Sequence, residues 1–323
     1  MLINWIKKIG NKAQHSAFVD LCKFKQQLFC CYREAQNHIS ANGTIRILTL
    51  DVEGKVLRSN RIAIANTDLR DPKITLTPDG QLLLIAYARQ TSTNNQTIGT
   101  RNLTWISQTG HSWSAAREFA ARGWWLWRVR WHKDQAYGFA YNRKHNAVHL
   151  YSGNPRRSFH LHQPFALSLH KHQKGYPNES DLIFDKDKAY ALVRRDADSY
   201  TAQLGHSRFP YKKWSWIDLD RYIGGPTMLR LDKDYALVAG RIVKQGRLVT
   251  GLLKMNLVNG ELQKLLLLPS AGDNSYPGLV MTKDSLYVSY YSSHEDNKSC
   301  VYLAKLNIQS LLHKNKQALD IVK

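Results

Sequence analysis

The stretch RDPKITLTPDGQLLLIAYAR, residues 70–89, joins two strand-like segments through a short polar turn. The segments on either side of the turn are rich in the branched and bulky apolar residues that pleated sheets favour. Pro78, Asp79 and Gly80 between them are residue types that tight turns prefer. The stretch therefore predicts an antiparallel hairpin.

The same pattern, a turn followed by an apolar strand, recurs along the chain. The second strands of the successive hairpins begin at residues 27, 81, 135, 188, 234 and 285, which is a period of about fifty residues. Their sequences are QLFCCYR, QLLLIAYAR, QAYGFAYNR, KAYALVRR, DYALVAGR and SLYVSYY. A further strand-like segment precedes each of them, from SAFVDLCKF in the first unit to SYPGLVMTKD in the last. Three or four strands per repeat are expected.

Six repeats of this kind predict an all-β, six-bladed β-propeller that forms one domain over residues 1–323, with a short N-terminal lead-in and a C-terminal tail. A pair of β-sandwiches is the main alternative, but no Pro/Gly/Ser-rich linker divides the chain. A helix is expected only near the C-terminus, in SLLHKNKQALDIVK. Equivalent strand ends of a propeller converge on the central axis, so we expect the functional side chains there.

The chain is strongly basic, with 46 Lys and Arg against 25 Asp and Glu and a net charge of +21. Such an excess attracts anionic partners: nucleic acid, anionic lipid or acidic sugar. No run of five or six basic residues and no nucleic-acid recognition motif is present, so the sequence does not favour a nucleic-acid partner. The charge alone does not choose among these partners.

Cysteine and histidine spacing indicates no metal, cofactor or disulfide framework. The four cysteines are Cys22, Cys30, Cys31 and Cys300, without C-x-x-C spacing, and histidines and carboxylates are scattered. The N-terminal segment has lysines where a signal peptide needs its apolar core, and nowhere do eighteen apolar residues run together. We therefore expect a soluble, cytoplasmic protein without a membrane span. The oligomeric state is left open.

Arginine ends the second strand in five of the six units: Arg33, Arg89, Arg143, Arg195 and Arg241. One arginine at a strand end is an ordinary surface residue, but equivalent ends of successive blades face a common ring. Several guanidinium groups there would bind a carboxylate, sulfate or phosphate in a bidentate manner. This recurrence predicts an anionic ligand on the axis.

Acidic groups gather near the same strand ends. They are Glu34 in YREAQNH, Asp68 and Asp71 in DLRDP, Glu179 and Asp181 in NESDL, and Asp273 in DNSYP. Each could simply pair with an arginine. A glycosidase, however, needs two placed groups on opposite sides of a glycosidic bond, and this inventory supplies them.

The segment NESDLIFDKDKAYALVRRDADSYTAQLGHSRFPYKKW, residues 178–214, resembles the sialidase-like glycoside hydrolases. In that family a glutamate begins a strand, an arginine ends the next, and an Asp box follows; here these are Glu179, Arg195 and a degenerate box from Ser207 to Trp214. SYPGLV occupies the place of the family's Tyr-Ser. The resemblance implies a six-bladed propeller in which Tyr276 is the nucleophile and Glu179 is its base.

Other matches to the family are weaker. LRDP, residues 69–72, is similar to the family's Arg-Ile-Pro but stands in the second blade instead of the first, and DVEG and SQTGHSW look like worn Asp boxes. The overall pattern resembles the uncharacterised bacterial branch of the family. The acid is not fixed by the motifs, so Glu34, His38 and Asp71 remain candidates.

Two functions fit these observations. The first is an exo-acting, retaining glycosidase of sialidase type that takes a terminal acidic sugar, bound by Arg33, Arg70, Arg195, Arg241 and Asp273. The second is a non-catalytic propeller that binds an anionic glycan or a protein. The segment GWWLWRVRW, residues 123–131, fits equally well a sugar-stacking platform and a half-buried blade strand.

Overall fold

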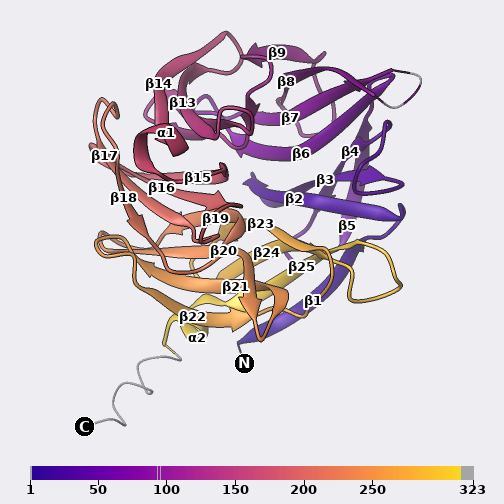
Figure 1. The fold of residues 1–323 in the computed structure, drawn as a ribbon. Helices are drawn as coiled ribbons and strands as arrows, with labels where there is room; N and C mark the ends of the chain where they lie inside the picture. The colour runs from indigo at the N-terminus through magenta and orange to yellow at the C-terminus, as the bar shows by residue number, and fades with distance from the viewer. Residues whose placement is uncertain (1, 93, 95, 314–323) are drawn as a thin grey trace.

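The computed structural model, which describes residues 2–92, 94 and 96–313, contains six antiparallel sheets arranged in a ring around a central axis (Figure 1). Each sheet is a blade whose first strand lies innermost, so that β2 contacts β6 and β23, and β19 contacts β15 and β23. The prediction of an all-β, six-bladed propeller is confirmed. Among the described residues, no helix is both long and apolar enough to cross a membrane.

The strands of the first three blades follow the chain. The first blade holds β2 (His15–Phe24), β3 (Gln27–Ala35), β4 (Thr44–Leu50) and β5 (Val56–Ile62). The second holds β6 (Thr67–Leu76), β7 (Leu82–Thr91), β8 (Thr97–Ser107) and β9 (Arg117–Ala120). The third has an inner strand in two pieces, β10 (Trp125–Leu126) and β11 (Arg130–His132), followed by β12 (Gln135–Asn142), β13 (Ala147–Asn154) and β14 (Ser158–Ser168).

A short helix, α1 (Leu169–His172), leads into the remaining blades. The fourth blade holds β15 (Pro177–Asp185), β16 (Lys188–Arg195), β17 (Gln203–Arg208) and β18 (Ser215–Asp218). The fifth holds β19 (Gly224–Arg230), β20 (Tyr235–Lys244), β21 (Arg247–Asn256) and β22 (Leu262–Leu267). The sixth holds β23 (Asn274–Met281), β24 (Ser285–Ser292), β25 (Cys300–Asn307) and β1 (Ile3–Gly10).

The N-terminal strand closes the ring. Residues before His15 were predicted to be a lead-in, but β1 pairs antiparallel with β25 and forms the outer edge of the sixth blade. Lys8 reinforces this closure through ion pairs of 2.7 Å with Glu295 and Asp296. The predicted C-terminal helix begins as α2 (Ile308–His313), and the rest of that segment lies outside the described residues.

The core lies between neighbouring blades. Phe29 of the first blade, for example, packs in one cluster with Leu84 and Trp105 of the second. The four cysteines are buried, and burial raises the pKa of the Cys30 and Cys31 thiols. These thiols act as small apolar side chains.

The worn Asp boxes all lie in turns between the third and fourth strands of their blades. Asp51 accepts backbone hydrogen bonds from Glu53 and Lys55, and Ser107 accepts them from Thr109 and Gly110. In the fourth blade, the Ser207 hydroxyl donates to the carbonyl oxygen of residue 213 at 2.6 Å. Side-chain oxygens thus stabilise these turns without an intact motif.

Each inner strand carries an equivalent β-bulge. Two residues stand opposite one of the neighbouring strand at residues 18–19, 71–72, 178–179, 225–226 and 276–277, and the third blade has its irregularity between β10 and β11. A bulge re-aims a side chain and bends the strand. The six bulges therefore turn one residue or two per blade toward the same end of the axis.

Buried ion pairs cross the axis beneath the bulges. Asp20 of β2 pairs with Arg128 of the third blade at 2.8 Å, and its other oxygen accepts the Ile74 backbone N–H at 3.0 Å. Asp181 of β15 pairs with Arg130 at 2.6 Å and accepts the Met228 backbone N–H at 2.8 Å. These two aspartates therefore connect the inner strands of five blades.

Replacing Asp20 by Asn should strongly destabilise the propeller. The change leaves the Arg128 guanidinium buried beside a neutral partner, which costs about 3 kcal/mol or more of unfolding free energy. Asp187→Asn, which removes the same charge from an exposed pair with Arg208, should cost less than about 1 kcal/mol. Urea unfolding of both variants measures the difference, and equal losses would show that the axial pair does not hold the blades.

Candidate active site

A cavity of about 210 Å³ opens at the end of the axis toward which the bulges point. Four of the five predicted catalytic residues line it from four different blades: His38, Asp71, Glu179 and Tyr276. The other lining residues are Phe18, Arg70, Trp125, Tyr141, Tyr176, Asn178, Arg194 and Asp196. The propeller thus brings together side chains that lie far apart in the sequence.

Tyr276 and Glu179 form a hydrogen-bonded pair in the floor of the cavity. The Tyr276 hydroxyl donates to Glu179 Oε1 at 2.5 Å. Arg194 Nη1 donates both to Glu179 Oε2 at 2.6 Å and to the Tyr276 oxygen at 3.0 Å. The Gly225 backbone N–H completes the set, donating to Glu179 Oε2 at 2.7 Å. The carboxylate is therefore held in one orientation, with one oxygen reserved for the phenol.

Burial and the negative charge of Glu179 raise the pKa of Tyr276 well above its ordinary value, although Arg194 and Arg241 act in the opposite direction. The phenol is therefore neutral near neutral pH. It can become a nucleophile only if its proton passes to a base as it reacts, and Glu179 is in hydrogen-bond contact with it.

The backbone around Tyr276 is forced into an uncommon conformation. Ser275 and Tyr276 have φ values of 92° and 50°, a region that side-chain-bearing residues seldom adopt. The Tyr276 ring lies against Phe18, Trp127 and Tyr291, with ring centroids 5.3 to 5.8 Å away. Packing on several sides holds this strained residue in place, as is common at functional sites.

Asp71 occupies the equivalent bulge of the second blade, with φ of 47°. Burial raises the pKa of Asp71 to about 6, and the charge of Glu179 adds to this increase, while Arg70, Lys73 and Arg33 oppose it. About half of this carboxyl group is therefore protonated near pH 6 and about a tenth at pH 7, so that a proton donor is available in slightly acidic solution.

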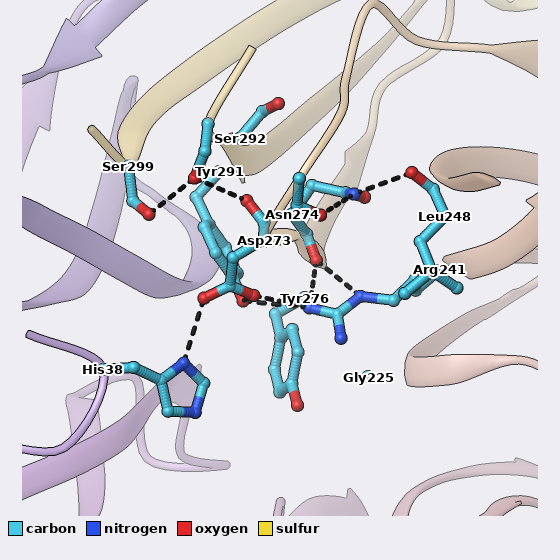
Figure 2. A network of polar contacts seen from close by, with 12 residues as sticks. His38, Gly225, Arg241, Leu248, Asp273, Asn274, Tyr276, Tyr291, Ser292 and Ser299 are labelled. Atoms are coloured by element: carbon cyan, nitrogen blue, oxygen red, sulfur yellow. Dashed lines mark hydrogen bonds and ion pairs between the residues drawn. The ribbon is translucent and has the colours of Figure 1, made fainter. Parts of the chain in front are cut away.

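A second network lies beside the pair and is shown in Figure 2. Asp273 Oδ1 accepts hydrogen bonds from Tyr291 at 2.7 Å and from Arg241 Nη2 at 2.9 Å. Its Oδ2 atom lies 3.1 Å from His15 Nε2 and 3.0 Å from His38 Nδ1. Burial alone would raise the pKa of Asp273, but these hydrogen bonds and the Arg241 charge hold it well below its usual range.

His15, His38 and Asp273 place three potential metal-ligand atoms within 4.8 Å of one another. Arg33 Nη1 lies 3.3 Å from His15 Nδ1, and a guanidinium can only donate. Burial lowers the pKa of His15, so the ring is neutral and its proton is on Nε2, where it donates to Asp273. No lone pair of His15 then faces the other two side chains, and this donor set does not fit a metal ion.

Five predicted site residues lie outside the cavity lining: Arg33, Arg195, Glu34, Arg241 and Asp273. Arg33 is fully buried and pairs bidentately with Asp68 at 2.6 and 3.1 Å. Arg195 is also fully buried, and its hydrogen bonds go to the 197–201 loop and to the Gly175 carbonyl. Glu34 accepts two hydrogen bonds from Arg46 at 2.7 and 3.0 Å. Arg33, Arg195 and Glu34 brace the loops around the cavity instead of facing it.

The remaining predicted arginines divide between the cavity and its surroundings. Arg70 lines the cavity, where its guanidinium lies 5.2 Å from the Phe18 ring and 5.7 Å from the Trp125 ring. Arg241 does not line it, since its guanidinium lies beside the Tyr276 ring at 5.3 Å and pairs with Asp273 (Figure 2).

Arg194, which the strand-end pattern did not single out, takes the place expected for Arg195. Successive side chains of a strand point to opposite faces, so only one of two adjacent arginines can face the cavity. Arg194 stands opposite the bulge that carries Glu179. The sequence alone does not show which of the two arginines faces the cavity, because that depends on the position of the bulge.

The tryptophan-rich segment divides between the cavity lining and the core, and its sugar-stacking role stays a prediction. Trp125 lines the cavity and stacks between Tyr87 and Tyr141, with ring centroids at 4.0 and 5.6 Å. Trp127 is buried beneath Tyr276, and Trp124 stacks on His149 away from the cavity lining.

A larger cavity of about 580 Å³ lies at the other end of the fourth and fifth blades. It is bounded by the beginning of β16 and the end of β17, whereas Glu179 and Arg194 lie at the opposite ends of their strands. Its lining, which includes Lys188, Trp214 and Val258, has no acidic residue. This lining therefore does not offer the pair of carboxyl groups that the smaller cavity contains.

The blade number, the strand order and an axial Tyr–Glu–Arg cluster define a propeller of the sialidase fold. Among solved structures, a Dyadobacter fermentans protein of unknown function matches with a TM-score of 0.76 at 16% identity, covering 95% of this chain and 100% of that one. The NanB sialidase of Streptococcus pneumoniae matches with a TM-score of 0.70 at 11% identity, covering 96% of this chain and 71% of the sialidase.

The Trypanosoma rangeli sialidase matches with a TM-score of 0.66 at 9% identity, and 99% of this chain covers 60% of that protein. No family model matches the sequence, and the search of curated proteins finds no relative. At these sequence identities, the similarity to the solved structures shows a shared fold.

Replacing Gly225 by Ala should damage the site selectively. Gly225 has φ of 55°, and a Cβ atom there would lie 2.9 Å from Cγ of Tyr276. We expect a loss of about 1–2 kcal/mol of unfolding free energy from backbone strain and a further 1–3 kcal/mol or so from the clash. Gly246 has φ of 73°, and a Cβ atom there would have no atom within 4 Å. Gly246→Ala should therefore lose only the unfolding free energy that comes from backbone strain. Equal losses in urea unfolding would contradict the proposed contact.

Proposed function

We propose that the protein is an exo-acting, retaining glycosidase that uses Tyr276 as nucleophile, Glu179 as the base of that nucleophile and Asp71 as the general acid. The observation that supports this most directly is the 2.5 Å hydrogen bond between Tyr276 and Glu179, held by Arg194 at the floor of a cavity. A volume of about 210 Å³ suits one terminal sugar ring and not an extended chain.

In the first step, Tyr276 Oη attacks the anomeric carbon while its proton passes to Glu179. The bond from that carbon to the leaving oxygen breaks as Asp71 donates its proton to the oxygen. Water then attacks the anomeric carbon and gives its proton to Asp71. The bond to Tyr276 Oη breaks, and Glu179 returns the proton to the phenol oxygen.

Arg194 supports both halves of this exchange. Its Nη1 atom contacts the carboxylate that gains the proton and the oxygen that loses it, so its positive charge stabilises the developing phenolate. Among the candidate acids, Asp71 is favoured because it is buried in the cavity lining. Glu34 is paired with Arg46, and the Nδ1 atom of His38 is engaged by Asp273.

Tyr276→Phe and Glu179→Gln should each lower kcat/KM for a responsive aryl glycoside by about 10³-fold or more, because each removes a group of the covalent step. Tyr235→Phe, at the beginning of β20 near the opposite end of its blade, should leave kcat/KM unchanged. The test is a screen of aryl glycosides with detection of the released sugar. Glycan binding without any release of product would instead favour the non-catalytic alternative.

The pH dependence should report the proton on Asp71. Because burial raises the pKa of Asp71 to about 6, the protonated form is lost as pH rises through this value, and kcat/KM should fall above about pH 6. Asp71→Asn should abolish this fall in kcat/KM with rising pH. It should also cost about 10²-fold or more with poor leaving groups, while sparing substrates whose leaving group needs no proton. Equal losses of kcat/KM for both substrate types would show that Asp71 is not the general acid.

A further inference from the structure

We infer that the sugar bound in this cavity is uncharged, and that Asp196 is the residue that excludes acidic sugars by occupying Arg194. This inference rests on the proposed function, and it departs from the acidic sugar that the arginine pattern predicts. It follows from what the arginines of the structure already bind.

Arg194 has no edge left for an incoming carboxylate. Its Nε and Nη2 atoms each lie 2.9 Å from an oxygen of Asp196, in the parallel arrangement by which a guanidinium binds a carboxylate. Its Nη1 atom is held by Glu179 and Tyr276. Asp196 therefore occupies the edge of Arg194 that a substrate carboxylate would need.

The other arginines also bind carboxylates of the protein, Arg33 through two nitrogen atoms and Arg70 and Arg241 through one each. Arg33 and Arg241 are paired with Asp68 and Asp273, and neither of them lines the cavity. Arg70 does line it, but Nη1 is bound to Asp68 at 3.2 Å and to the His38 carbonyl at 2.8 Å, and its guanidinium stacks on aromatic rings. The guanidinium groups thus mainly fix the protein's own carboxylates.

The balance of charge in the lining points the same way. Among the described lining residues, two arginines face the carboxylates of Glu179 and Asp196 and the carboxyl group of Asp71, which is uncharged in its acid form, so the arginines leave no excess positive charge. A sugar carboxylate would approach these groups in a partly desolvated site, where like charges repel strongly. Because the nucleophile is a neutral phenol and not a further carboxylate, it adds no negative charge to the lining.

The cavity does offer what a neutral sugar needs. The rings of Phe18, Tyr141 and Tyr176 line the cavity and provide apolar surface for the C–H groups of a sugar ring. Asp196 and Asn178 present polar atoms to hydroxyl groups, and Asn178 Nδ2 donates to Asp196 Oδ2 at 3.1 Å, which steadies that carboxylate. Carboxylate oxygens accept hydrogen bonds from sugar hydroxyls and repel sugar carboxylates.

The experiment compares neutral aryl glycosides with aryl uronides and an aryl sialoside on three proteins: wild type, Asp196→Asn and the control Asp187→Asn. Asp187 is an exposed partner of Arg208 outside the cavity lining, so its replacement removes the same charge elsewhere. Wild type and the control should prefer the neutral class in kcat/KM by about tenfold or more. Asp196→Asn should shift the acidic-to-neutral ratio about tenfold toward acidic substrates.

Binding of the free sugars, followed by saturation-transfer NMR, separates the two proposals. Neutral sugars that bind without any hydrolysis of their glycosides would overturn the proposed function and support this inference. Acidic substrates that are preferred by wild type, with hydrolysis lost in Tyr276→Phe, would overturn the inference and support the function. An unchanged ratio in Asp196→Asn would overturn the role of Asp196, and binding of neither class would overturn both proposals.

Discussion

The charge network across the axis is the constraint on which the rest of the structure depends. Asp20 and Asp181 each bind an arginine of the third blade and a backbone N–H of the next blade along the ring. The sixth blade joins through backbone packing, since a Cβ atom on Gly278 would lie 2.2 Å from the Leu21 nitrogen. Buried charges tolerate few arrangements, because each must keep its partners. The inner strands are therefore fixed relative to one another.

This rigidity is what permits a strained site at the end of the axis. Tyr276 and Asp71 have positive φ values at their bulges, and neither conformation is favourable by itself. Packing between blades holds them, so that a phenol and a carboxylate 97 residues apart meet at 2.5 Å. The arginines around the cavity also hold the structure in place, because each of them pairs with at least one carboxylate of the protein itself. A ring of arginines in a sequence thus need not be an anion site.

Much of the fold could be predicted because hairpin formation is local. Turn residues and apolar strands recur about every fifty residues, and each pair folds against its neighbour in the chain, as β6 and β7 do. The closing strand β1 was missed because its partner, β25, lies at the far end of the sequence. In the site, resemblance indicated Tyr276 and Glu179, whereas Arg194 and Asp196 were missed. Their orientation depends on the register at a bulge, which no local pattern displays.

The sequence by itself determined the number of blades, their opening hairpins and the placement of Tyr276, Glu179 and Asp71 at equivalent strand positions, because periodicity and turn chemistry act over short distances. Only the tertiary structure decided which side chains face the cavity and with what charge. Arg33 and Arg195 became buried braces, and Arg194 became bound to Asp196. The physical reason is that a buried charged side chain can pair with partners from several blades. Which partner it binds is settled only when those blades pack together.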